Sequence, residues 1–162
     1  MTAREINFRI GHGYDAHCLT EGRKLIMGGV YIPWDKGLLG HSDADVVTHA
    51  LCDALLGALG AGDIGRHFPD SAPEYEGIDS LRLLEMVMVK VHEAAHRLIN
   101  ADLTIIAQQP RLSPYISQMR RNLAAVCGVS KAEVNVKATT TEGMGFSGRL
   151  EGIACHAVTL LG

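Results

Sequence analysis

The stretch Gly11-His12-Gly13-Tyr14-Asp15-Ala16-His17 decides how this chain is organised. It ends a segment, residues 6–17, whose apolar positions first alternate with polar ones, which is typical of a β-strand. In an extended segment Asp15 and His17 leave the same face, because side chains alternate along a strand. A carboxylate beside an imidazole supplies two ligands for a divalent metal. Gly11 and Gly13 lack a Cβ, so a ligand or another backbone can approach this strand closely.

A third metal ligand is expected from a helix that begins at Ser42 and runs to about Leu59. Ser42 and Asp45 have the spacing of a capping box, with Asp in place of the usual Glu. Residues 45, 49 and 53 are Asp, His and Asp, and their spacing of four places them on one face of the helix. We therefore predict that His49 joins the first two ligands, and that Asp45 or Asp53 holds its second nitrogen.

The predicted ligands Asp15, His17 and His49 offer one oxygen and two nitrogens, a set that suits Zn²⁺. Three protein ligands leave one coordination position open, as in catalytic rather than structural zinc sites. On the residues alone, two other interpretations stay open. The first two residues could form a hydrogen-bonded pair at a strand end, and His49 could be a satisfied histidine in a buried helix, because a two-residue motif has little specificity.

The composition indicates one globular domain over residues 1–162. Hydrophobic residues make up 47% and charged residues 20%, the formal net charge is −3, and no run of Lys or Arg suggests a nucleic-acid surface. The four scattered cysteines are typical of reduced thiols. Residues 1–8 have no secretory apolar region, and no apolar run approaches the roughly 18 residues of a membrane span. We expect a cytoplasmic protein without nucleic-acid or membrane partners.

The periodicity of the rest of the chain alternates between helix and strand. It predicts a hairpin over 24–32 that turns at Gly28-Gly29, a loop over 33–40, a long loop over 60–77, a helix over 80–98, a strand over 103–107, a helix from Ser113-Pro114 to Gly128, and strands over 134–138 and 152–160. Interleaved strands and amphipathic helices favour an α/β (α+β) sandwich. We expect a mixed sheet of about four main strands with three helices on one side, plus a small hairpin.

Residues 139–149 form a hydroxyl-rich and glycine-rich loop that follows a predicted strand. Backbone N–H groups in such a turn can bind an anion, while Thr hydroxyls and Arg149 can bind phosphate oxygens. Glu142 would suit a Mg²⁺ ion that also contacts substrate phosphates. His41 lies just before the predicted helix start, where backbone N–H groups favour anions. The competing interpretations are a polar surface loop for residues 139–149 and an exposed loop histidine for His41. His12, His67, His92, His96 and His156 show no pattern that predicts a partner.

Six short motifs carry a resemblance to a known enzyme family over essentially the whole chain after Phe8. They are Gly11–His17, His41–Asp45, Asp63–Gly65, Phe68–Asp70, Val136–Glu142 and Gly152–Ala154. Together they resemble 2-C-methyl-D-erythritol 2,4-cyclodiphosphate synthases of the non-mevalonate isoprenoid pathway. The resemblance implies that 4-diphosphocytidyl-2-C-methyl-D-erythritol 2-phosphate is cyclised by its own 2-phosphate, with release of CMP. It also implies a homotrimer with active sites between subunits, each combining one subunit's metal side with its neighbour's nucleotide side.

The same resemblance implies roles for individual residues. The implied zinc ligands are Asp15, His17 and His49, and the implied catalytic residues are His41 and Thr140. Glu142 would bind a Mg²⁺ or Mn²⁺ ion that also contacts substrate phosphates. Substrate contacts fall on Asp15, His17, His41, Ser42, Asp63, Ile64, Gly65, Phe68 and Asp70. The cytidine pocket matches Ala107, Pro110, Arg111, Leu112 and Ser113, and the diphosphate site Thr139, Thr140, Thr141 and Glu142. Phe146 and Arg149 match positions that contact a phosphate or an isoprenoid diphosphate. The sequence neither requires nor excludes an isoprenoid diphosphate on the trimer axis.

The chain departs from the family pattern at four positions. Ala44 stands where the family usually has Gly, and Gly143 where a longer residue is common. Leu150 interrupts the sequence that usually follows Arg149 in the family, and His156 replaces an acidic residue found in some members. Two other functions fit the residues: a zinc phosphoesterase that uses His41 as its acid, and a non-catalytic metal-stabilised sensor of isoprenoid diphosphates. The H-E-x-x-H and P-C-x-x-C signatures of metalloproteases and zinc deaminases are absent.

Overall fold

The computed structural model describes residues 7–162, so Ile6 of the predicted first strand lies outside the described part. Its centre is a five-stranded sheet in the order β4-β1-β7-β5-β6. The strands are β1 (Arg9–Glu21), β4 (Lys36–Leu38), β5 (Leu98–Ile106), β6 (Val134–Thr139) and β7 (Gly152–Leu161). Only β5 and β6 pair in parallel; the other neighbours are antiparallel. The predicted mixed sheet with four main strands is confirmed, with β4 as a short addition.

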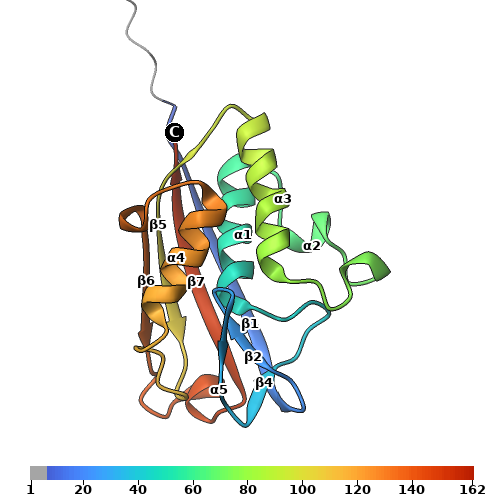
Figure 1. Ribbon diagram of the computed structural model, residues 1–162, viewed down its shortest axis with the longest axis vertical. Helices are drawn as coiled ribbons and strands as arrows, with labels where there is room; N and C mark the ends of the chain where they lie inside the picture. The colour runs from blue at the N-terminus through green and yellow to red at the C-terminus, as the bar shows by residue number, and fades with distance from the viewer. Residues whose placement is uncertain (1–6) are drawn as a thin grey trace, which may run out of the picture.

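Three long helices cover one face of this sheet, as Figure 1 shows. They are α1 (Val46–Leu59), α3 (Ser80–Glu93) and α4 (Ile116–Cys127). Helix α1 packs on β1 and β7, α4 packs beside β6, and α3 packs against both helices. The expected hairpin forms from β2 (Leu25–Met27) and β3 (Val30–Ile32), which pair antiparallel around Gly28 and Gly29. Two four-residue helices, α2 (Ile64–His67) and α5 (Gly145–Gly148), and two 3₁₀ turns (Pro73–Tyr75 and Lys131–Glu133) complete the fold.

Main-chain contact sets the distance between α1 and β1. A Cβ on Gly11 would come within 1.7 Å of the Ala54 carbonyl oxygen, and one on Gly13 within 2.0 Å of the Ala50 carbonyl oxygen. No side chain fits at such distances, so glycine is required at both positions. The prediction that another backbone approaches β1 closely is therefore confirmed, and that backbone belongs to the helix that carries His49.

The start of α1 differs from the prediction. The helix begins after Asp45, whose side chain accepts hydrogen bonds from the N–H groups of Val47 and Thr48. Ser42 instead bonds within the preceding turn, where its Oγ accepts from the Ala44 N–H at 3.1 Å. Ala44 has a positive φ of 58°, which a right-handed helix cannot include. A capping box from Ser42 is therefore wrong, although the helix and its end at Leu59 are right.

Asp45 also fastens the β2–β3 hairpin to α1. Its carboxylate is fully buried and accepts from the N–H groups of Gly28 at 2.8 Å and Gly29 at 2.7 Å, and from the Thr48 hydroxyl at 2.8 Å. Burial and the neighbouring Asp43 charge raise the pKa of Asp45, while hydrogen bonds from Thr48 and Gly29 oppose this rise. One side chain thus orders two elements that are distant in the sequence.

Four other boundaries differ from the sequence predictions. The loop expected over 33–40 contains β4, which pairs with the end of β1 at Leu19–Glu21. The loop expected over 60–77 contains α2, capped by Asp63. Helix α3 stops at Glu93 because Ala95 has a positive φ of 59°, and Leu98 instead pairs with Leu161 in the sheet. Helix α4 starts at Ile116, after a turn in which the Tyr115 N–H bonds the Leu112 carbonyl, so Ser113 does not cap it.

The sheet face opposite the helices carries apolar side chains that stay exposed in the chain. Along β7, Ile153, Cys155 and Ala157 are buried, whereas Val158 on the other face is 46% exposed. On β1 the equivalent exposed positions include Ile10 and Tyr14.

Within residues 7–162, no helix has the length and hydrophobicity to span a membrane. All four cysteines are free, and burial raises the pKa of the Cys127 thiol to about 12.

Candidate metal centre and nucleotide pocket

The three predicted metal ligands converge between β1 and α1. Asp15 Oδ2 lies 2.9 Å from His17 Nε2 and 3.1 Å from His49 Nδ1, and the two imidazole nitrogens are 3.1 Å apart. Among residues 7–162, these are the only three His, Cys, Asp or Glu side chains that gather in this way. One carboxylate oxygen and two imidazole nitrogens at such spacing form a donor set that fits a tetrahedral divalent ion.

Neighbouring groups hold each imidazole so that its other nitrogen faces the centre. His17 Nδ1–H donates to the Leu39 carbonyl at 2.7 Å. His49 Nε2 lies 2.8 Å from Ser80 Oγ and 3.1 Å from Ser42 Oγ. The Ser80 hydroxyl in turn donates to Asp43, whose other oxygen accepts from the Ser80 N–H. Such outer contacts orient metal ligands and set their tautomers.

The predicted support of His49 by Asp45 or Asp53 is therefore wrong. Asp45 points toward the hairpin, and Asp53 accepts from the Ile64 N–H at 2.9 Å, which ties α2 to α1. Burial is the main cause of the raised pKa of Asp53. Ser80, at the start of α3, takes the supporting role, and the sequence places it 31 residues from His49.

The electrostatics of the centre favour a positive ion. Burial opposes the charge on Asp15, but hydrogen bonds from His17 and His49 outweigh it and hold the pKa of Asp15 well below its usual range. Burial also opposes the charge on His17, but the hydrogen bond and charge of Asp15 raise the pKa of that imidazole above 6.5. The carboxylate is therefore ionised at neutral pH and attracts positive charge to this position.

A cavity of about 210 Å³ opens beside the three ligands. His41, Ser42, Ile64, Gly65, Phe68 and Asp70, all predicted as substrate contacts, line it. The His41 imidazole donates to the Ala72 carbonyl at 3.1 Å. Asp63 does not line the cavity; its side chain caps α2 by accepting from the Arg66 N–H at 2.9 Å. Tyr75 and Leu83 also line the cavity and were not predicted from the sequence.

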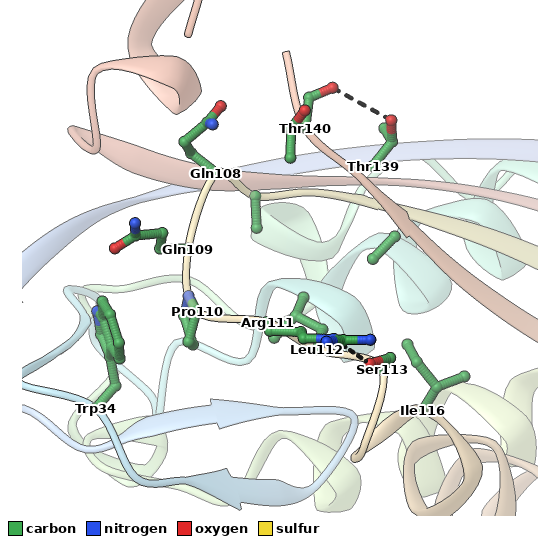
Figure 2. A pocket seen from close by; sticks show the side chains of 12 residues that line it. Trp34, Gln108, Gln109, Pro110, Arg111, Leu112, Ser113, Ile116, Thr139 and Thr140 are labelled. Carbon is green, nitrogen blue, oxygen red and sulfur yellow. Dashed lines mark hydrogen bonds between the residues drawn. The ribbon is translucent and has the colours of Figure 1, made fainter. Parts of the chain in front are cut away.

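A second cavity of about 680 Å³ lies near the ends of β5 and β6. Figure 2 shows Trp34 and Pro110 on one side of it and Thr139 and Thr140 on another, with the Arg111 side chain bonded to Ser113. The predicted residues Ala107, Pro110, Arg111, Leu112, Ser113, Thr139 and Thr140 all line this cavity. Trp34 and Ile116, which lie in none of the six motifs, also line this cavity, as does Ala138, a motif residue for which no contact was predicted.

Four of the predicted phosphate-side residues lie outside this cavity. Thr141 and Phe146 line a smaller hollow of about 250 Å³ beside it. Glu142 accepts a hydrogen bond from the Thr140 hydroxyl at 3.3 Å, so its carboxylate stays beside the predicted catalytic threonine. Arg149 is exposed and paired with Glu151 at 2.8 Å. Within one chain, Arg149 therefore faces solvent rather than the large cavity.

Comparison with known proteins agrees with this geometry. The model of the YgbB family matches residues 8–162. The chain belongs to this family. It is 61% identical over 153 residues to 2-C-methyl-D-erythritol 2,4-cyclodiphosphate synthase of Trichlorobacter lovleyi, an alignment that covers 94% of this chain and 98% of the relative. The bifunctional enzyme IspD/IspF of Desulfotalea psychrophila is also 61% identical, but this chain spans only 40% of its length.

Solved structures of YgbB-family proteins have the same fold. A 2C-methyl-D-erythritol-2,4-cyclodiphosphate synthase in a CDP-bound form matches with a TM-score of 0.87 at 36% identity, covering 95% of this chain and 100% of that one. The CDP complex of IspF from Plasmodium falciparum matches with a TM-score of 0.84 at 33% identity, covering 96% of each chain. The resemblance to this family and the predicted fold class are thereby confirmed.

Proposed function

We propose that this chain cyclises 4-diphosphocytidyl-2-C-methyl-D-erythritol 2-phosphate to 2-C-methyl-D-erythritol 2,4-cyclodiphosphate. An oxygen of the 2-phosphate forms a bond to the β-phosphorus, the bond from that phosphorus to the bridging oxygen breaks, and CMP leaves with this oxygen. The observation that carries the proposal is the convergence of Asp15, His17 and His49 at a cavity, in a chain about 60% identical to synthases of this name. YgbB-family membership supports the same reaction.

The reaction needs little proton transfer, which agrees with the side chains present. A phosphate monoester is largely dianionic at pH 7, because its second pKa is about 6. The barrier is therefore mainly charge repulsion and ring closure, which positioning and neutralisation can lower. Zn²⁺ held by Asp15, His17 and His49 would supply Lewis-acid polarisation of the β-phosphate. His41 and Ser42, on the wall of the same cavity, would orient the methylerythritol side of the substrate.

The large cavity would bind the cytidine end of the substrate. Pro110, Leu112 and Ile116 give it apolar walls, while the backbone of residues 107–113 supplies polar groups for the base. Thr139 and Thr140 would donate to the diphosphate at the edge of this cavity. Glu142, next to Thr140, would hold Mg²⁺ or Mn²⁺ together with substrate phosphates.

Assembly from three subunits would bring the two cavities together. The lining residues of the metal-side and nucleotide-side cavities do not overlap, yet one substrate must reach both. We propose that the exposed apolar sheet face, which includes Ile10, Tyr14 and Val158, packs against copies of the chain. The neighbouring subunit would then supply the nucleotide side of each site. Phe146 lines a hollow together with Tyr14 of this face. An isoprenoid diphosphate on the axis would contact Phe146 and Arg149. A cytoplasmic location agrees with this role.

Product analysis of the metal-loaded protein tests the proposed reaction. Incubation with the substrate should release CMP and yield a cyclic diphosphate that contains no label from ¹⁸O-water. His49→Ala or Asp15→Ala should abolish CMP release, while circular dichroism and the assembly size stay those of the wild type. Incorporation of ¹⁸O into a phosphate product would indicate hydrolysis instead. Unchanged CMP release by either variant would overturn the assigned metal chemistry.

A further inference from the structure

Two histidines that no sequence pattern connects meet on the sheet face opposite the helices. His12 lies on β1 and His156 on β7, and in the β1–β7 register they occupy diagonal positions, opposite Val158 and Tyr14 respectively. His12 Nε2 and His156 Nδ1 are 3.1 Å apart, and the side chains are exposed. The Tyr14 ring packs on His156, with centroids 4.8 Å apart.

The separation of the two nitrogens is that of two ligands on one metal ion. Two Zn–N bonds of about 2.0–2.1 Å, at angles between about 90° and 110°, place the nitrogens about 2.8–3.4 Å apart. The imidazole nitrogens of His17 and His49 in the predicted metal centre show the same 3.1 Å separation. The His12–His156 pair therefore has the geometry of two nitrogen ligands already in place.

The surroundings leave room for the remaining ligands. His156 borders a hollow of about 250 Å³ whose other lining residues include Tyr14, Met144 and Phe146 but neither Lys nor Arg. No formal positive charge in that lining would oppose an incoming cation. Water molecules, or groups of another copy packed on this face, could complete the coordination, as is usual where the protein supplies few ligands.

We propose that His12 and His156 form a second metal site, for a divalent ion that prefers imidazole nitrogen such as Zn²⁺, Ni²⁺ or Cu²⁺. This site is separate from the metal centre, because residues 12 and 14 leave the face of β1 opposite to residues 15 and 17. Neither histidine lines the two cavities that the proposed reaction uses, although both lie on the sheet face proposed to pack against other copies of the chain.

Metal stoichiometry of the full chain tests this proposal. Chelator-treated protein is dialysed against Zn²⁺, and bound metal per chain is measured by atomic absorption in the wild type, His12→Gln and His156→Gln. Glutamine can keep a hydrogen bond between the two positions but is a poor zinc ligand. His92→Gln serves as the matched control, because it removes an exposed imidazole on α3, away from the sheet face.

The expected result is more than one equivalent of zinc per chain in the wild type and in His92→Gln. Both His12→Gln and His156→Gln should lose the binding above one equivalent, while the zinc bound by Asp15, His17 and His49 remains and the circular dichroism spectrum stays that of the wild type. An additional equivalent per chain and an additional equivalent per assembly both support the site. Equal stoichiometry in all four proteins would overturn it and leave the pair as a hydrogen bond. If one variant fails to fold, the other decides the outcome alone.

Discussion

Replacing Asp45 by alanine should separate the start of α1 from the β2–β3 hairpin. One carboxylate oxygen accepts from the N–H groups of Gly28, Val47 and Thr48, and the other from the Gly29 N–H and the Thr48 hydroxyl. All five distances lie between 2.7 and 3.1 Å. Because the side chain is fully buried, water cannot replace these bonds in the variant without a change in packing.

The magnitude follows from the groups left without a partner. Loss of an N-cap costs about 0.5–2 kcal/mol. Each buried donor without an acceptor costs about 1–3 kcal/mol more, and the hairpin contributes the buried Gly28 N–H and the partly buried Gly29 N–H, whose loss costs less. We expect Asp45→Ala to lower the free energy of unfolding by about 2–7 kcal/mol, a large part of the ~5–15 kcal/mol typical of a domain. Asp45→Asn keeps one oxygen and should lose about half as much.

Urea unfolding of the metal-free chain, followed by circular dichroism, measures this loss. Asp79→Ala is the matched control, because Asp79 caps α3 through one bond, to the Leu81 N–H at 2.9 Å. It should cost only about 1 kcal/mol. Equal losses for Asp45→Ala and Asp79→Ala would refute the reasoning, since the bonds to the hairpin would then add nothing.

Three further predictions concern the metal centre and the turn before α1. Ser80→Ala removes the nearer of the two hydroxyl partners of His49 Nε2, leaving Ser42, and should weaken zinc binding about 10-fold in competition with a chelator; an affinity within twofold of wild type would be inconsistent with this role. In the metal-free protein, the raised pKa of His17 means that its bond to Asp15 stabilises fully below pH 6.5 and is lost as pH rises through the higher folded pKa. Thermal melts between about pH 6 and 9 should therefore show a larger loss in wild type than in His17→Gln, and parallel losses would contradict the assignment. Ala44→Gly relieves a positive φ of 58° and should raise the free energy of unfolding by up to ~1 kcal/mol in urea titrations, whereas a lowered value would show that the Ala44 methyl group matters more.

Local periodicity was sufficient to predict the main elements and to place three candidate metal ligands on faces that meet. Asp15 and His17 alternate on a strand whose register follows from its own sequence, and His49 lies on the only strongly apolar helix of the described chain that also carries a polar stripe. These features depend on neighbours a few residues away. The same is true of the glycine turn between β2 and β3 and of the end of α4 at Gly128.

Tertiary contacts decided what the sequence could not predict. Ser80 supports His49 from another helix, and Trp34 borders the nucleotide cavity from the segment after β3, so neither role has a local signal. The spacing of Ser42 and Asp45 indicated a capping box, but the positive φ of Ala44 between them prevents a helix there. The strand β4 has only three residues and forms because β1 continues to Glu21.

Three of the four positions where the resemblance implies a departure from the family pattern have a left-handed backbone. Ala44 and Leu150 have a positive φ, of 58° and 60°. Glycine adopts this conformation without strain, whereas other residues do so at a cost. Gly143, where a longer residue is common, also has a positive φ, of 79°, so here the departure is toward the residue that the backbone prefers.

The direct backbone contact of α1 with Gly11 and Gly13 of β1 affects which substitutions can move the helix. A helix that rests on side chains can shift when those side chains are exchanged, but this one rests on carbonyl oxygens that no substitution can resize. Substitutions at other core positions should therefore leave unchanged the distance between His49 on α1 and Asp15 and His17 on β1, the three candidate ligands.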